Sequence, residues 1–151
     1  LLSTKEGRRV LIIPIVILIA FSGYTIYQTE FNGKPERVEM QDGSGEVKLT
    51  KRSELSSFKL PKEVGEVRDI IGEDMKVTAY DVYVDKDNNI TSASVTMKAD
   101  EAKAQEIISL YESKYSLQKG MSDWEGSAQG FDMSLSYDSN DQRIDIDLKK
   151  Q

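Results

Sequence analysis

Residues 131–148 read FDMSLSYDSNDQRIDIDL, and this stretch determines more of the fold than any other in the chain. Apolar and polar residues alternate strictly along its first half and again along its second half, on either side of a turn-forming run at 138–142. A period of two with one apolar side predicts two antiparallel strands that bury one face and expose the other to water.

A second hairpin is predicted upstream, because residues 76–84 and 90–98 are rich in valine, threonine and tyrosine and flank a turn-forming run. Between the two hairpins, residues 100–117 predict a helix. Asp100 suits its N-cap, Gly120 lies just past its end, and an apolar stripe follows helical spacing: Ala104, Ile107, Ile108, Tyr111 and Tyr115. The predicted fold class is therefore α+β, a small ββαββ domain in which one helix covers an antiparallel four-stranded sheet.

The polar segment before these elements allows two interpretations. Residues 30–55 read either as a linker or as a short hairpin around a glycine-rich turn. Residues 59–73 fit either a helix or an extended stretch. We assign residues 56–151 to the outer α+β domain, which is long enough to bury one modest core without disulfides.

The strongest signal of location is a run of 20 uncharged residues at 10–29, VLIIPIVILIAFSGYTIYQT. A helix of that length is about 30 Å long, which matches the hydrocarbon core of a bilayer. The sequence therefore predicts one N-terminal transmembrane helix that anchors the chain in the lipid bilayer. Its most apolar part consists of Val10, Leu11, Ile12, Ile13, Pro14, Ile15, Val16, Ile17, Leu18, Ile19, Ala20 and Phe21.

Basic residues set the predicted orientation of this helix. Residues 1–9 carry a net charge of +2, so the positive-inside rule makes them a cytoplasmic tail, with or without a further segment upstream of Leu1. The predicted location is the cell membrane, with one span and an extracytoplasmic C-terminal domain. A signal peptide cleaved after Ser22 is the alternative, and cleavage there would release a secreted domain.

The composition excludes several classes of function. The chain has no cysteine and no histidine, so thiol nucleophiles, disulfides, Cys/His zinc sites and catalytic imidazoles are impossible within it. The residues from Glu30 onward carry 17 basic and 25 acidic side chains, a net charge of −8, which disfavours nucleic acid as a partner. We expect no catalytic residue and no cofactor.

Four residues are candidates for binding a partner: Trp124, Asp132, Asp145 and Asp147. The aspartates fall on the polar side of the last predicted hairpin, where they would receive a basic partner or hold a cation, or would simply be solvated. Trp124, the only tryptophan, would either form an exposed apolar patch with Met121 and Phe131 or cap one end of the core.

One further run has metal-ligand spacing at its start. Asp85, Asp87 and Asn89 begin like a calcium-binding loop, but Ile90 stands where that loop needs glycine and Thr96 where it needs glutamate. The sequence therefore predicts a plain hairpin turn here and no metal site.

These features together predict a single-pass, membrane-anchored and non-catalytic protein. Its outer domain would be a binding module or an accessory subunit of a membrane complex, with a protein partner in or outside the membrane. The layout is similar to that of many small single-span cell-surface proteins of Gram-positive bacteria. Two other functions stay open: a membrane sensor or regulator that binds a ligand outside, and a carboxylate-based hydrolase acting on wall glycan.

Overall fold

The computed structural model describes residues 34–53 and 57–151. The predicted cytoplasmic tail at 1–9 and the predicted span at 10–29, with all twelve anchor residues, lie outside the described residues. Among the residues that are described, no helix is both long and apolar enough to cross a bilayer. The chain from Pro35 to Gln151 belongs to one structural unit.

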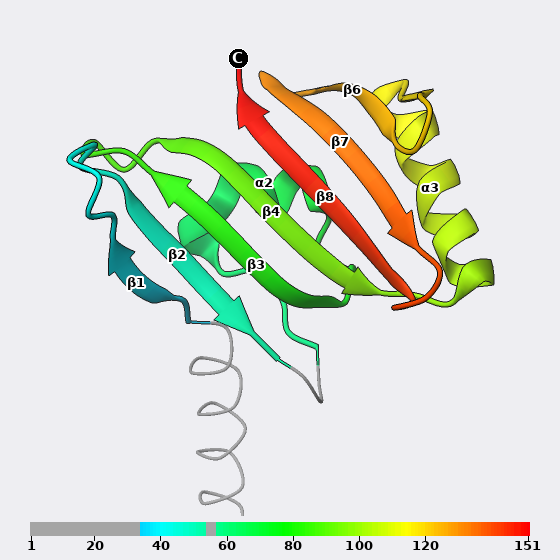
Figure 1. Cartoon of the computed structure of the whole chain (residues 1–151), viewed down its shortest axis with the longest axis horizontal. Coiled ribbons are helices and arrows are strands. Elements are labelled where there is room, and N and C mark those ends of the chain that lie inside the picture. The colour runs from blue at the N-terminus through cyan, green and yellow to red at the C-terminus, as the bar shows by residue number, and fades with distance from the viewer. Residues whose placement is uncertain (1–33, 54–56) are drawn as a thin grey trace, which may run out of the picture. The chain divides into compact units, whose positions relative to one another are not determined.

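Strands dominate this unit and form one antiparallel sheet (Figure 1). In chain order they are β1 (Glu36–Glu39), β2 (Val47–Arg52), β3 (Val77–Val84), β4 (Ile90–Lys98), β5 (Gln118–Lys119), β6 (Trp124–Ala128), β7 (Phe131–Asp138) and β8 (Arg143–Lys150). The order across the sheet is β1-β2-β3-β4-β8-β7-β6-β5. The first four strands therefore form one half of the sheet, the last four form the other, and the pairing of β4 with β8 joins them.

Helices pack on one face of the sheet. The short 3₁₀ turn η1 (Lys62–Val64) leads into α2 (Gly65–Ile71), which lies behind β3 and β4 in Figure 1. The longer helix α3 (Glu101–Tyr115) follows β4. Its N-cap is Asp100, whose carboxylate accepts a hydrogen bond from a first-turn N–H at 2.8 Å.

Two tyrosines hold α3 against the end of α2. The hydroxyl of Tyr111 donates a hydrogen bond of 2.6 Å to the carbonyl of Ile71, and that of Tyr115 donates one of 2.7 Å to the carbonyl of Ile70. Carbonyls in the last turn of a helix have no partner within the helix, so these bonds satisfy acceptors that would otherwise be unpaired.

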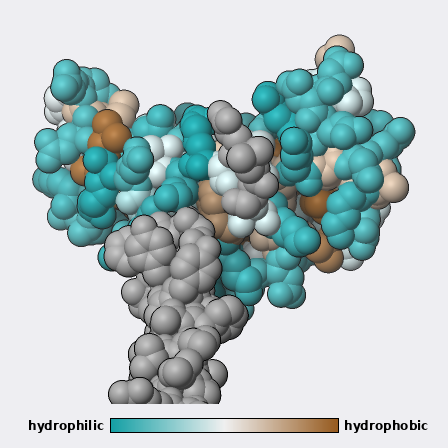
Figure 2. Space-filling model, turned by 90° about the horizontal axis from the view of Figure 1, so that it is seen from below, coloured by the Kyte–Doolittle hydropathy of each residue, from teal (hydrophilic) through white to brown (hydrophobic). Residues whose placement is uncertain are grey.

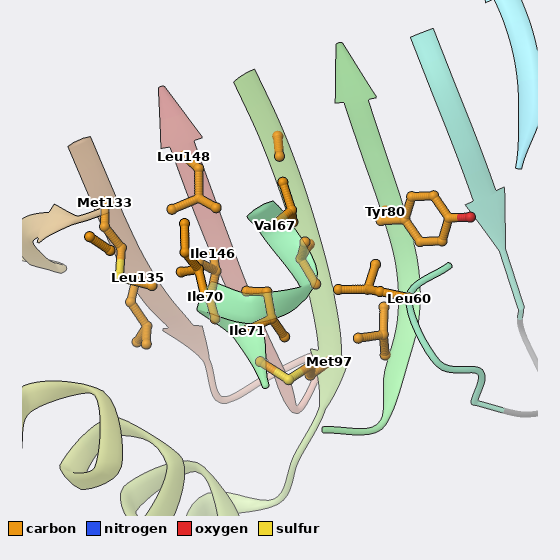
Figure 3. Packing of buried hydrophobic residues seen from close by; sticks show 14 of the residues in the cluster. Leu60, Val67, Ile70, Ile71, Tyr80, Met97, Met133, Leu135, Ile146 and Leu148 are labelled. Carbon is orange, nitrogen blue, oxygen red and sulfur yellow. The ribbon is translucent and has the colours of Figure 1, made fainter. Parts of the chain in front are cut away.

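The hydrophobic core lies between the helices and the sheet. Apolar side chains alternate with polar ones along β4, β7 and β8, and the apolar ones are buried. Figure 3 shows side chains of β7 and β8 meeting those of α2: Met133, Leu135, Ile146, Leu148, Val67, Ile70 and Ile71. The polar side chains of the same strands point to the opposite side, which we call the free face.

The predicted fold class, a small ββαββ domain, is wrong in its number of strands and helices. The sheet has eight strands rather than four, and two α-helices rather than one pack on it. The two predicted hairpins are present as β3–β4 and β7–β8, and the predicted helix is present as α3. The additional strands are β1, β2, β5 and β6, of which β1 and β2 form a hairpin within the predicted linker-or-hairpin segment.

Physical reasons explain why the sequence misses β5 and β6 and offers the β1–β2 hairpin only as one of two interpretations. β2 joins the sheet by pairing with β3 from Val47 to Arg52, and backbone pairing leaves no mark in the amino-acid pattern. In β1 and β2 only Leu49 is fully buried, so the alternation there is weak. β6 reads WEGSA, in which glycine, serine and alanine are poor strand signals.

Candidate partner-binding face

Strand register arranges the polar side chains of the free face in rows that cross the sheet. The central row runs from β2 to β6 through directly paired residues: Thr50, Asp81, Ser94, Asp147, Ser134 and Glu125. A neighbouring row contains Lys48, Tyr83, Ser92, Lys149 and Asp132. Alternation along each strand puts all of these residues on the side away from the helices.

Charges are neutralised in the half of the free face made by β2 and β3. The carboxylate of Asp81 accepts a hydrogen bond of 2.5 Å from the hydroxyl of Thr50. It also pairs with Lys48 at 3.7 Å and with Arg52 at 3.3 Å. This carboxylate is therefore occupied by its own neighbours and offers little to a partner.

The predicted aspartates do share the other half of the free face, but their surroundings differ. Asp145 accepts a hydrogen bond of 2.8 Å from the hydroxyl of Thr96 and one of 3.0 Å from the guanidinium of Arg143. The same hydrogen bond and charge raise the pKa of Arg143. Asp145 is thus tied into the sheet by neighbouring side chains.

Asp132 and Asp147 are the aspartates that stay available. Both are exposed. Asp132 accepts one hydrogen bond of 2.9 Å from the side-chain amide of Gln151, which brings no positive charge. Asp147 has neither a hydrogen-bond partner nor an ion-pair partner among residues 34–53 and 57–151. Two carboxylates therefore face solvent without a neutralising cation bound to them in this part of the chain.

Trp124 does not join these aspartates. It is paired with Leu135, a core residue, so its side chain is on the helix face of the sheet, where it packs partly buried against the core. The ammonium of Lys119 lies 5.5 Å from the centre of its ring. The alternative apolar patch does not form either, because Phe131 is fully buried while Met121 is fully exposed at the tip between β5 and β6.

Small side chains hollow the free face. One depression of about 390 Å³ lies over β6, β7 and β8 and is lined by side chains that include Glu125, Asp132, Ser134, Asp147 and Lys149. A second, of about 420 Å³, lies over β3, β4 and β8 and shares Asp147 and Lys149 with the first. Figure 2 shows the outline of the domain dipping between two raised and mainly hydrophilic sides. The two depressions form one shallow trough centred on β8.

Several residues that line the trough beside Asp132 and Asp147 were missed in the sequence prediction. They are serines and one tyrosine: Ser92, Ser94, Ser134 and Tyr83. The sequence showed that these residues lie on the polar side of alternating strands. It did not show the register that brings β4 beside β8. Without that register, the serines of β4 cannot be related to the aspartates of β8.

The described side chains do not provide a metal centre. Among residues 34–53 and 57–151, no three acidic side chains are grouped closely enough to hold a metal ion. In the turn at 85–89, the Asp85 carboxylate accepts backbone N–H bonds from Asn89 and Asp87, both at 2.9 Å, and these bonds lower its pKa. This carboxylate therefore caps its own hairpin turn.

Comparisons with protein-family models, with curated proteins and with solved structures find no match for this chain.

Proposed function

We propose that this chain is a non-catalytic, single-pass membrane protein whose extracytoplasmic domain binds a protein partner through the trough of the free face. The observation that carries the proposal is a difference between the two faces of the sheet. Helices α2 and α3 pack on one face, whereas the other presents rows of small polar side chains that include the un-neutralised carboxylates of Asp132 and Asp147.

Charge complementarity defines the chemistry of the partner. In the depression over β6, β7 and β8, Glu125, Asp132 and Asp147 face a single lysine, Lys149. A partner that places lysine or arginine side chains over Asp132 and Asp147 would gain charge-assisted hydrogen bonds. Ser94 and Ser134, on either side of Asp147, leave room for long side chains to reach that carboxylate. We therefore propose a basic protein surface as the occupant.

The proposed location follows from the uncharged run at 10–29 and from the basic residues before it. The non-catalytic character is supported by the side chains of the trough, which are serine, threonine, tyrosine, lysine and carboxylates with no histidine or cysteine anywhere in the chain. An accessory subunit that recruits or positions a membrane partner needs no more than this surface.

Topology is tested most directly by cysteine labelling, because the natural chain has no cysteine. We expect Ser139→Cys, in the exposed turn between β7 and β8, to react with a membrane-impermeant maleimide in intact cells. Ser3→Cys, on the predicted cytoplasmic side, should react only after the cells are permeabilised. Labelling of both sites in intact cells, or of neither, would contradict the proposed orientation.

The trough is tested by photo-crosslinking in cells that naturally make the protein. A photo-reactive amino acid at Ser94, in the centre of the free face, is expected to give one dominant adduct with a partner. The matched control is Leu110, which is 50% exposed on α3 and lies away from the trough. An equal adduct from the Leu110 site would show that the free face is not the docking surface.

Charge reversal then tests the chemistry of the partner. We expect the double substitution Asp132→Lys and Asp147→Lys to reduce the Ser94 adduct by about tenfold, because like charges across an interface repel. Glu112→Lys, on the exposed side of α3, is the control and should leave the adduct unchanged. If the double reversal has no effect, the partner does not recognise these carboxylates.

A further inference from the structure

A second cavity lies away from the free face and is surrounded by basic residues. Its volume is about 300 Å³, and we call it the basic cavity. Three elements contribute to it: the segment that leads from α2 into β3, the last residues of β4, and the first two turns of α3. The tertiary fold therefore brings together side chains that are distant in the sequence.

The floor of the basic cavity is apolar. Met97 and Ile107 are core residues that are 1% and 5% exposed, and Met75 packs partly buried against the same core. Methionine side chains are flexible and polarisable, so they adapt to bound apolar groups of differing shape. This floor suits a small apolar body, for example one aromatic ring.

The rim of the basic cavity is positively charged. It carries Lys76 and Lys103, opposed by one carboxylate, Asp74. Lys98 also lines the cavity, but it follows the buried Met97 in β4, so its side chain belongs to the free face. Lys103 makes an exposed ion pair of 3.3 Å with Glu106, which contributes little in water. Lys76 has no ion-pair partner within residues 34–53 and 57–151.

We infer that the basic cavity binds a small organic anion, in which a carboxylate, sulfonate or phosphate is attached to a short apolar body. The apolar body would displace water from Met75 and Met97, and the anionic group would meet Lys76 and Lys103. A cation would be repelled by the rim, and an uncharged apolar molecule would leave the lysines unmatched. The volume is at the lower end for ligand pockets, so the ligand is small. This inference is independent of the proposed function.

The methionines provide a direct test. The full chain has five methionines, and two of them line the basic cavity. When the chain is labelled at its methionine methyl groups and placed in phosphatidylcholine nanodiscs, these two report on the cavity and the other three serve as controls. In NMR spectra, we expect added benzoate to shift the methyl signals of Met75 and Met97 until the shift saturates. The methyl signals of Met40, Met121 and Met133 should stay in place. Benzyl alcohol, which lacks the charge, and acetate, which lacks the ring, should not saturate over the same range.

Lysine substitutions test the role of the rim. The double substitution Lys76→Gln and Lys103→Gln should raise the Kd for benzoate by about tenfold or more, because charge-assisted bonds are lost. Lys86→Gln, in the turn between β3 and β4, removes a lysine remote from the basic cavity and should leave the Kd unchanged. An unaltered Met133 signal shows that the variants remain folded.

Two outcomes would overturn the inference: benzoate shifts all five methionine signals equally or none of them, or Lys86→Gln weakens binding as much as the double substitution. Nanodiscs of phosphatidylglycerol distinguish the sources of the anion. If a lipid headgroup supplies it, the Met75 and Met97 signals shift without benzoate and the double substitution abolishes that shift. If a free anion supplies it, these signals move only when benzoate is added.

Discussion

Replacement of Ile146 by alanine is expected to lower the free energy of unfolding by about 2–5 kcal/mol. Ile146 lies in β8 at the centre of the sheet, is 0% exposed, and is paired with Val95 on one side and Leu135 on the other. Truncation there removes buried methyl groups and leaves a cavity that the neighbouring strands cannot close. Urea unfolding of the full chain in mild detergent, followed by the fluorescence of Trp124, measures the loss.

The next residue along the strand provides the matched control. Asp147 lies on the free face, so Asp147→Ala should change stability by about 0.5 kcal/mol or less. Ile146→Val, which removes one methylene group, should cost about 0.5–1.5 kcal/mol. If Asp147→Ala were as destabilising as Ile146→Ala, the assignment of buried and free faces would be wrong.

Stability is also expected to fall steeply as the pH rises above about 10, because two tyrosines are buried. Tyr80 and Tyr111 are each 1% exposed, and burial raises the pKa of both hydroxyls. An unfolded tyrosine ionises near pH 10, so above that pH the unfolded state loses protons that the folded state retains. Each tyrosine therefore contributes stability that is complete below pH 10 and declines by about 1.4 kcal/mol per pH unit above it.

Phenylalanine substitution separates this ionisation from other effects of alkali. Tyr111→Phe should cost about 1–3 kcal/mol at pH 7, since the Ile71 carbonyl loses its hydrogen bond, yet it should reduce the slope of stability against pH above 10. Ile146→Val, which lowers stability without removing an ionisable group, should keep the full slope. An unchanged slope for Tyr111→Phe would show that ionisation of Tyr111 does not drive alkaline unfolding.

The sequence alone predicted those elements whose pattern is strong within one segment. Alternation at 131–148 identified β7 and β8, and the apolar stripe with Asp100 as N-cap identified α3 within two residues at its C-terminal end. Strands with few buried residues are harder to predict, because their stability comes from pairing with neighbours: β6 was missed, and the β1–β2 hairpin was only one of two interpretations. The size of the sheet depends on those pairings.

The candidate site was predictable only in part, for a related reason. The polar side of the last hairpin placed Asp132, Asp145 and Asp147 on one face, as the structure shows. The alternation could not reveal that Thr96 and Arg143 occupy Asp145 while Asp147 is left without a partner in the described chain. Of the two interpretations of Trp124, packing against the core fits the structure, but the pairing with Leu135 that places it there was invisible in the sequence.

The position of β8 has a consequence for biosynthesis. Of the strands described, the one furthest along the chain joins the two halves of the sheet, since β4 and β7 both pair with it. A nascent chain that has emerged only as far as the turn at 138–142 therefore presents two unpaired strand edges, which are prone to pairing with other chains. Termination or trimming that removes β8 should consequently produce an aggregating polypeptide rather than a slightly shortened domain.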